Sequence, residues 1–492
     1  MEDIQAAVRA AAATRGPVTV RIPPGEHHLW PREENRRELY VSNTVGADPR
    51  YRTKTIGLLV EGADDLVIAG EGARIVLHGL QTTFAVLDSK RVRVEGLEFD
   101  FAVPTVVDAT VIEAGPGHRV IQVPAVTPFT IAGTSVHWHG ERTPAGGYTW
   151  WGRDGLDYTQ IFDPATGRTW RGPNPLFEGV RAMRRVGPRE IRIEYVHDMR
   201  PSDTGLVYAM RRTTRDHPGA LIDGSADITL SALRFRYLHG FGVVAQNSSG
   251  LTVEDCEFRT PPGAGRHTAG FADFLQVSGC WGRVAVRGCH FDGSHDDPIN
   301  VHGTYLRVAA QPRPDTLLLQ FAHPETAGLP LFGPGDEIEI VDRETLLPLA
   351  GARVRHVLQP SGRDHDGPLT SILLTADGPL PGGLAGVAAV ENTTRTPEVE
   401  IVRNVFRNTP TRAVLVTTRR PALIEGNRFE RTGMAAIYVS GDAREWWESG
   451  PVRDLTIRGN EFVEPGGPAV LFDPRPGEPV HSGIVIEENA VI

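Results

Sequence analysis

The chain is poor in several residues on which common protein functions depend. Its 492 residues include only three cysteines, Cys256, Cys280 and Cys289. This odd number, without metal-site spacing, argues against a disulfide framework and against a zinc cluster. Only two lysines are present, Lys54 and Lys90, and the net charge is −10 with no basic block, so nucleic acid and anionic membrane surfaces are poor partners. No apolar run reaches membrane-spanning length. A neutral substrate such as a sugar is compatible with this composition.

Glycine and proline, by contrast, are abundant. The 54 glycines and 38 prolines are spread along the whole chain, which indicates frequent turns instead of one flexible linker. A chain of this length is also too long for a single compact core. Either several domains or an elongated repeat is therefore expected.

A repeated pattern of alternating apolar residues closed by phenylalanine points to the elongated repeat. A second short apolar strand follows each unit, and the first two spacings are 23 and 33 residues. Such units stack because none can bury its own apolar side chains, and this pattern predicts a right-handed parallel β-helix. The units end at Phe235, Phe258, Phe291, Phe406, Phe429 and Phe462.

The same register predicts what the interior contains. The phenylalanines should form an aromatic stack, and Cys256 and Cys289 fall at one shared position, where packing is their expected role. An amide ladder at a turn is expected from Asn404, Asn427, Asn460 and Asn489.

Two stretches interrupt the repeat and divide the chain into five parts. Residues 104–219 and 304–394 alternate apolar and polar residues between turns, so each is expected to be a small inserted β-barrel or sandwich. Insertions of this kind usually wall a cleft. The fold class is thus all-β, with an N-terminal cap, including a short helix, and first turns at 1–103, central turns at 220–303 and C-terminal turns at 395–492.

Three carboxylates lie one repeat apart in the segment from 270 to 303. Asp273 precedes one strand, and Asp296 and Asp297 precede the next. Aligning the two strands by their apolar residues places Asp273 opposite Asp297. Because parallel strands stack about 4.8 Å apart, the carboxyl groups should lie roughly 5–9 Å apart, and the wider part of this range suits an inverting glycosidase. Pro298 holds Asp297 extended.

An alternative for these aspartates is a set of solvated turns or a calcium site. Asp-rich turns of β-helices hold calcium when carbonyls and further carboxylates join them. The segment offers too few such ligands, so no metal is expected. Other residues expected to face the same groove are His239, Asn300, His302, Arg412, Trp446 and Trp447.

An Asp one turn before an Asp-Asp pair, followed by a His, resembles the polygalacturonase-type glycosidases. The segments FADFL and HDDPINVHG more closely resemble glycoside hydrolase family 110, the exo-acting α-1,3-galactosidases that act on blood group B and linear α-galactose epitopes. The resemblance implies an inverting enzyme without metal or cofactor. In it, Asp296 is the general acid, and Asp273 and Asp297 activate the water. It also implies a secreted or cell-envelope enzyme of a bacterium, whose export signal this chain does not show. A homodimer through the inserts is compatible with it.

Two other classes of protein stay open beside a polygalacturonase-like hydrolase. A β-helix polysaccharide lyase needs a strong base and commonly calcium, and both lysines lie far upstream of the aspartates. A non-catalytic β-helix module that only binds glycans would have no reason to gather three carboxylates. Release of free galactose, against an unsaturated product, separates these functions.

Overall fold

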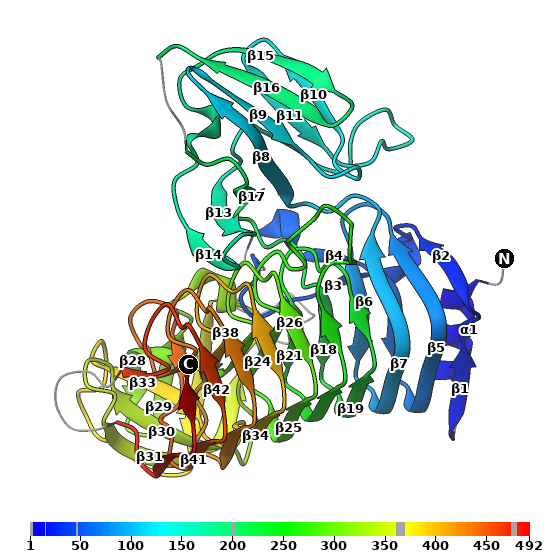
Figure 1. Cartoon of the computed structure of the whole chain (residues 1–492). Coiled ribbons are helices and arrows are strands. Elements are labelled where there is room, and N and C mark those ends of the chain that lie inside the picture. Colours follow the sequence, from blue (N-terminus) through cyan, green and yellow to red (C-terminus); the bar gives the residue numbers. More distant parts are fainter. Residues whose placement is uncertain (1–2, 15, 46–47, 198–201, 361–369, 474–479) are drawn as a thin grey trace.

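The computed structural model describes residues 3–14, 16–45, 48–197, 202–360, 370–473 and 480–492, and it shows a long parallel β-helix with two inserted domains (Figure 1). Helix α1 (Ile4–Ala12) covers the first turns, and Asp3 caps it by accepting from two backbone N–H groups. The Gln5 amide is buried and exchanges two hydrogen bonds with the backbone of Leu59, which fixes this cap on the sheet. No helix among the described residues has the length and apolarity needed to cross a membrane.

Three parallel faces make up the helix, and they confirm the predicted parallel β-helix. The long strands β5 and β7 run through the first two faces. The first face has the order β1 (Val18–Arg21), β5 (Asp64–Leu77), β7 (Lys90–Phe101), β19 (Ala226–Ser231), β22 (Ser249–Glu254), β25 (Trp281–Arg287), β34 (Glu398–Val402), β37 (Ala422–Glu425), β41 (Leu455–Arg458) and β44 (Ile484–Glu487). The second continues from β2 (Gly25–Leu29), β5 and β7 through β20 (Arg234–Phe235), β23 (Glu257–Phe258), β26 (His290–Asp292), β35 (Val405–Arg407), β38 (Arg428–Glu430), β42 (Glu461–Val463) and β45 (Ala490–Val491).

The third face carries the functional residues described below. The antiparallel strand β3 (Arg36–Glu38) begins it by pairing with β4. The parallel strands that follow are β4 (Thr53–Glu61), β6 (Thr82–Leu87), β18 (Ala220–Asp223), β21 (Val243–Gln246), β24 (Leu275–Ser278), β27 (Ile299–Thr304), β36 (Val414–Val416), β39 (Ile437–Ser440) and β43 (Val470–Asp473).

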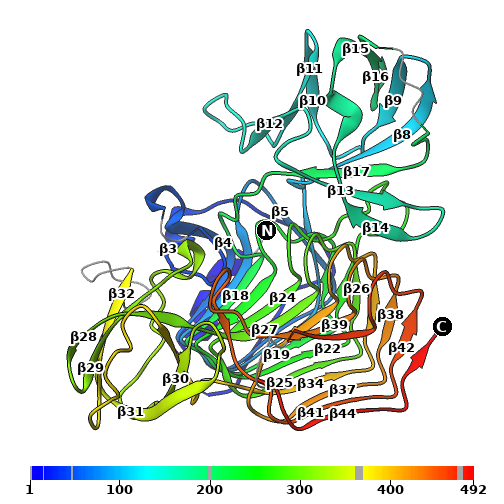
Figure 2. The same ribbon diagram turned by 90° about the vertical axis from the view of Figure 1, so that its left-hand side faces the viewer.

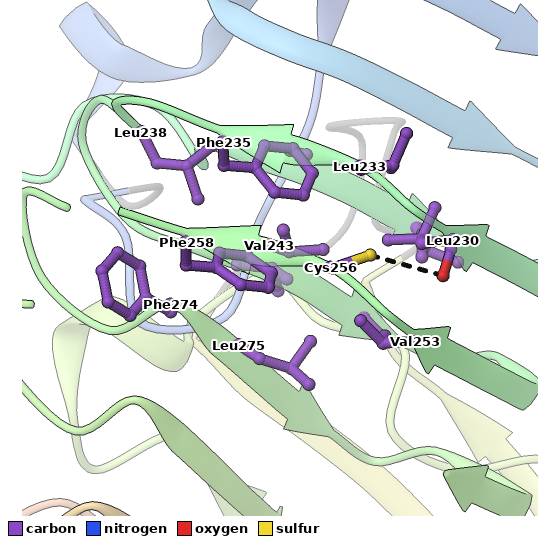
Figure 3. Close-up of a cluster of buried hydrophobic side chains, with 14 of the residues drawn as sticks. Leu230, Leu233, Phe235, Leu238, Val243, Val253, Cys256, Phe258, Phe274 and Leu275 are labelled. Atoms are coloured by element: carbon purple, nitrogen blue, oxygen red, sulfur yellow. Dashed lines mark hydrogen bonds between the residues drawn. The ribbon is translucent and has the colours of Figure 1, made fainter. Parts of the chain in front are cut away.

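The aromatic stack and the amide ladder are both present. Figure 3 shows part of the interior, where Phe235 and Phe258 lie one above the other with ring centroids 4.8 Å apart. The stack runs on to Phe462, with successive centroids no more than 5.1 Å apart beyond Phe258. The ladder places each Asn side-chain oxygen against the backbone N–H of the turn before it, as in Asn427 to Asn404 at 2.9 Å. Buried Cys256 donates to the Leu230 carbonyl, so packing is its role.

The first insert is a sandwich of two antiparallel sheets. One has seven strands in the order β14 (Arg168–Arg171), β13 (Tyr158–Asp163), β17 (Val207–Arg211), β8 (Val107–Gly115), β9 (His118–Gln122), β16 (Glu190–Tyr195) and β15 (Val180–Gly187). The other has β10 (Phe129–Ala132), β11 (Ser135–His139) and β12 (Trp151–Arg153). Both share a core around buried Trp138. Figure 2 shows this insert standing over one side of the β-helix, with β13 and β14 lowest.

The second insert is a closed six-stranded barrel. Its strand order is β28 (Leu306–Arg313), β29 (Thr316–Gln320), β32 (Ser371–Ala376), β31 (Pro348–Leu358), β30 (Glu337–Asp342) and β33 (Ala388–Asn392). The barrel has a core of its own. A separate small cluster that includes Tyr305 and Trp447 fixes the barrel to the loop that follows β39. Four 3-10 helices among the described residues are η1 (Glu33–Asn35), η2 (Pro49–Tyr51), η3 (Pro175–Phe177) and η4 (Pro324–Thr326).

Candidate active site

The three aspartates come together because of the register of the third face. Strand β24 pairs with β27 so that Leu275 lies opposite Ile299, which places Asp273 opposite Asp297 two residues earlier. Strand β27 pairs with β36 in the register that puts Arg412 opposite Asp297. The alignment made from the apolar residues of the sequence is therefore confirmed.

A cleft of about 140 Å³ opens where these strands begin. Its walls come from the β-helix, from the first insert and from the loop that contains Trp446. The lining residues are Asn43, Arg171, Arg215, Phe241, Asp273, Asp296, Asp297, Asn300, Arg412, Trp446 and Glu448. Four acidic and three basic side chains thus face one small volume, and such a density of charge makes strong mutual shifts of pKa unavoidable.

Asp296 lies between two arginines. Its Oδ1 is 2.9 Å from Nη2 of Arg171, at the end of β14, and its Oδ2 accepts from Nη2 of Arg215 at 3.3 Å. Burial would raise the pKa of this carboxyl, but the surrounding guanidinium groups outweigh burial and lower it. Asp296 is accordingly ionised in the free site.

The pKa values of Asp297 and Asp273 shift in the opposite direction, upward. Arg412 donates to Asp297 from Nη2 at 2.6 Å, from Nε at 3.1 Å and from its backbone N–H at 3.2 Å. Burial nevertheless raises the pKa of Asp297 to about 6, against the attraction of Arg412 and with the help of Asp296. Asp273 accepts no hydrogen bond from any described residue, and burial together with its two acidic neighbours raises its pKa well above the usual range. Burial and neighbouring negative charge thus favour the protonated form of Asp273, whereas the guanidinium groups favour the ionised form of Asp296.

Two more of the expected groove residues take part in the cleft. Asn300 lines it and donates from Nδ2 to Glu448 at 3.2 Å; Glu448 belongs to the short strand β40 (Glu448–Ser449), which pairs with the end of β27. Trp446 is 43% exposed, stacks on His323 and lies 5.7 Å from the Arg215 guanidinium. An exposed indole beside polar groups is suited to one face of a sugar ring.

Three expected groove residues lie elsewhere, which corrects their predicted places. His302 is buried behind the cleft, where it accepts from Gln276 and donates to the Gly303 carbonyl. His239 lines a different cavity, because the register of β21 and β24 puts Phe241, two residues later, in line with Asp273. Trp447 is 5% exposed and packs in the cluster that holds the barrel.

Five cleft residues were not expected from the sequence: Asn43, Arg171, Arg215, Phe241 and Glu448. Extending the strand alignment by one turn would have found Phe241. No periodic signal marks the other four, since they come from the first insert, from loops and from the short strand β40.

The described residues contain one cluster whose ligand atoms lie close enough for a metal ion: Asp216, His217 and His239, outside the cleft. Its hydrogen bonds do not fit that role. The Thr55 backbone N–H donates to Nε2 of His217, so a neutral His217 carries its proton on Nδ1, the atom that faces Asp216. His239 likewise uses both ring nitrogens, on Thr105 and Asp216.

A small cleft with three carboxylates, whose pKa values are shifted apart, is suited to acid–base chemistry on a polar ligand. Comparison with known proteins specifies the class of enzyme. The family model described as GLAA-B beta-barrel domain II matches residues 316–385, within the barrel insert. The chain is 50% identical to alpha-1,3-galactosidase A of Streptomyces avermitilis, over 99% of this chain and 80% of that protein.

Other relatives carry the same name. Identity is 46% to the alpha-1,3-galactosidase A of Peterkaempfera griseoplana, over 99% of this chain and 70% of the relative. Identity to the alpha-1,3-galactosidase A of Bacteroides thetaiotaomicron is 36%, over 99% of this chain and 84% of the relative. The A-module of mannuronan C-5 epimerase AlgE4 from Azotobacter vinelandii, a solved structure, matches over 99% of this chain and 90% of its own with 10% identity and a TM-score of 0.29, too low to carry an argument. The chain belongs to the alpha-1,3-galactosidase family, glycoside hydrolase family 110, and is a glycoside hydrolase.

Proposed function

We propose that this glycoside hydrolase removes terminal α-1,3-linked galactose from glycans, as in blood group B and linear α-galactose structures, with inversion at the anomeric carbon. The observation that carries the proposal is the placement of Asp273 and Asp297 on adjacent turns with Asp296 beside them. The names of the relatives supply the sugar. A lyase is disfavoured, because acidic side chains outnumber basic ones in the cleft.

The exposure of the side chains supports a division of roles. The Asp296 side chain is 18% exposed and the Asp297 side chain 3%, so Asp296 lies nearer the mouth where a leaving group departs. Asp296 is the general acid, and Asp297 is the base that accepts a proton from water between itself and Asp273. The water oxygen bonds to the anomeric carbon, the glycosidic C–O bond breaks, and the departing oxygen takes the proton of Asp296.

The charges of the free site add a requirement to this mechanism. The lowered pKa keeps Asp296 ionised before substrate binds, whereas the raised pKa of Asp273 favours its protonated form. For Asp296 to act as the acid, binding of the galactoside must bring a proton to it, and Asp273, the neighbouring carboxyl with the raised pKa, is the proposed source. Arg171 and Arg215 oppose this transfer until sugar hydroxyl groups compete for their N–H donors. Arg412, Asn300 and Trp446 bind the galactose.

The experiment compares two substrates with different leaving groups in the presence of a chelator. Galactosyl-α-1,3-galactose needs an acid, and α-galactosyl fluoride needs little help to lose fluoride. Asp296→Asn should lower activity on the disaccharide by about 10²- to 10⁴-fold and retain most of the activity on the fluoride. Asp297→Asn should lose activity on both. NMR of the first product should show β-galactose.

A matched control is Asp292→Asn, a half-buried aspartate on β26, outside the cleft. Its activity on both substrates should equal that of the wild type. Retention of fluoride hydrolysis in Asp273→Asn instead of Asp296→Asn would move the acid to Asp273. An unsaturated product, or full activity in all three cleft variants, would refute the proposed function.

A further inference from the structure

A second cavity, of about 240 Å³, lies beside the cleft between the first insert and the β-helix. Its walls include Trp150 and Trp151 from the insert, and Asp216, His239 and Phe271 from the turns below. Figure 2 shows β12, which begins at Trp151, on the side of the insert that faces β3 and β4. Tyr51, from the segment between those two strands, completes the wall.

The cavity and the cleft are neighbours along the chain at three places. Arg215 lines the cleft and Asp216 lines the second cavity. In the turns below, Phe271 lies two residues before Asp273, and His239 lies two residues before Phe241. Two residues of extended chain span at most roughly 7 Å. The second cavity thus begins about one sugar ring away from the carboxylates.

Hydrogen bonds hold the side chain at the floor of this cavity, whereas two side chains of its wall are open to a ligand. His239 is held by hydrogen bonds to Thr105 at 2.7 Å and to Asp216 at 2.8 Å. Trp151, in contrast, is 60% exposed, although the pairing of β12 with β11 fixes its backbone. The guanidinium of Arg212 makes no ion pair or hydrogen bond with any described residue. A rigid concave site with one open indole and one free donor suits a ligand that has an apolar face and hydroxyl edges.

We propose that the second cavity binds the sugar to which the terminal galactose is attached. Trp151 lies against the face of that sugar ring, and Arg212 donates to its hydroxyl groups. The inference rests on the proposed galactosidase function and adds the residues that position the rest of the glycan. Trp151 and Arg212 are positioning residues, because neither touches the bond that breaks.

The test uses α-galactosyl fluoride and galactosyl-α-1,3-galactose. The fluoride has no second sugar, so it fills only the cleft, whereas the disaccharide reaches the second cavity. Trp151→Ala should lower kcat/KM about five- to tenfold on the disaccharide, mainly through KM, and leave the fluoride unchanged. Trp151→Phe keeps an aromatic face and should restore most of the loss. Trp281→Ala, which removes an exposed indole from β25 on another face, is the matched control and should change neither substrate.

The failure of this inference differs from the failure of the proposed function. If wild-type protein hydrolyses neither substrate, the galactosidase proposal falls. If the wild type is active but Trp151→Ala lowers kcat/KM equally on both substrates, or on neither of them, the second cavity does not bind the second sugar. Failure of Trp151→Phe to recover activity on the disaccharide would also overturn the role of the aromatic face.

Discussion

The pairing of Arg412 with Asp297 makes a quantitative prediction about pH. Asp297 must be ionised to act as the base, and its pKa is about 6. Because kcat/KM reports the ionisation of the free enzyme, wild-type kcat/KM should fall as pH drops below about 6. Arg412→Gln removes the guanidinium that lowers this pKa through hydrogen bonds from Nε and Nη2.

The size of the shift follows from these contacts. A hydrogen bond to a charged group contributes about 1.5–3 kcal/mol, and one pKa unit corresponds to about 1.4 kcal/mol. The pKa of Asp297 should therefore rise by about 1–2 units in Arg412→Gln, which moves the acidic limb to about pH 7–8. At pH 6 this shift alone should lower kcat/KM roughly 5- to 50-fold below that of the wild type, and this part of the loss should be recovered in alkaline buffer, whereas the part due to weaker galactose binding should not depend on pH.

The assay is kcat/KM for α-galactosyl fluoride between pH 4 and 9. Arg407→Gln is the control, since Arg407 pairs with Glu430 on another face and its side chain is 45% exposed. Its profile should match that of the wild type. An Arg412→Gln enzyme with lowered activity but an unmoved acidic limb would refute the assignment of Asp297 as the base.

Two further predictions concern the two tryptophans of one loop and the aromatic stack. Trp447→Ala should destabilise the fold by about 3–5 kcal/mol in urea unfolding, because the indole is buried, whereas exposed Trp446→Ala should keep its stability and raise KM. The opposite pattern would place Trp447 in the cleft. Phe291→Ala should also cost about 3–5 kcal/mol, because its ring is fully buried and packs between Phe258 and Phe406. Equal unfolding midpoints for Phe291→Ala and wild type would show that the stack does not hold adjacent turns together.

Periodicity explains which features could be predicted from the sequence. The phenylalanine stack, the amide ladder and the alignment of Asp273, Asp297 and Arg412 all follow from one repeated translation along the helix axis. A residue whose position is set by the repeat can be located from its distance to the next apolar strand. His239 lies two residues before the position that faces the cleft, since Phe241 is the residue opposite Asp273 on the adjacent turn.

The residues that escaped prediction lie outside the repeat. Arg171 and Arg215, which set the charge of Asp296, come from the first insert and from the segment that returns from it. The repeat period carries no information about how an insert docks on the helix, which depends on individual contacts such as that of Arg171 with the His295 carbonyl. Trp446 and Trp447 are adjacent, yet a positive φ of 62° at Trp447 accompanies its turn into the core. Such a local backbone conformation determines which of the two tryptophans faces the cleft and which packs in the core, and no sequence pattern reveals it.

The cleft draws on segments from Asn43 to Glu448. A β-helix can form turn by turn from its N-terminal cap during synthesis, since the strands of each turn pair with those of the adjacent turns. The turns that carry the three aspartates would then be in place well before Arg412, Trp446 and Glu448 leave the ribosome. In this order of folding, a nascent chain that ends after the barrel contains the three aspartates but lacks Arg412, Trp446 and Glu448, so its cleft is incomplete.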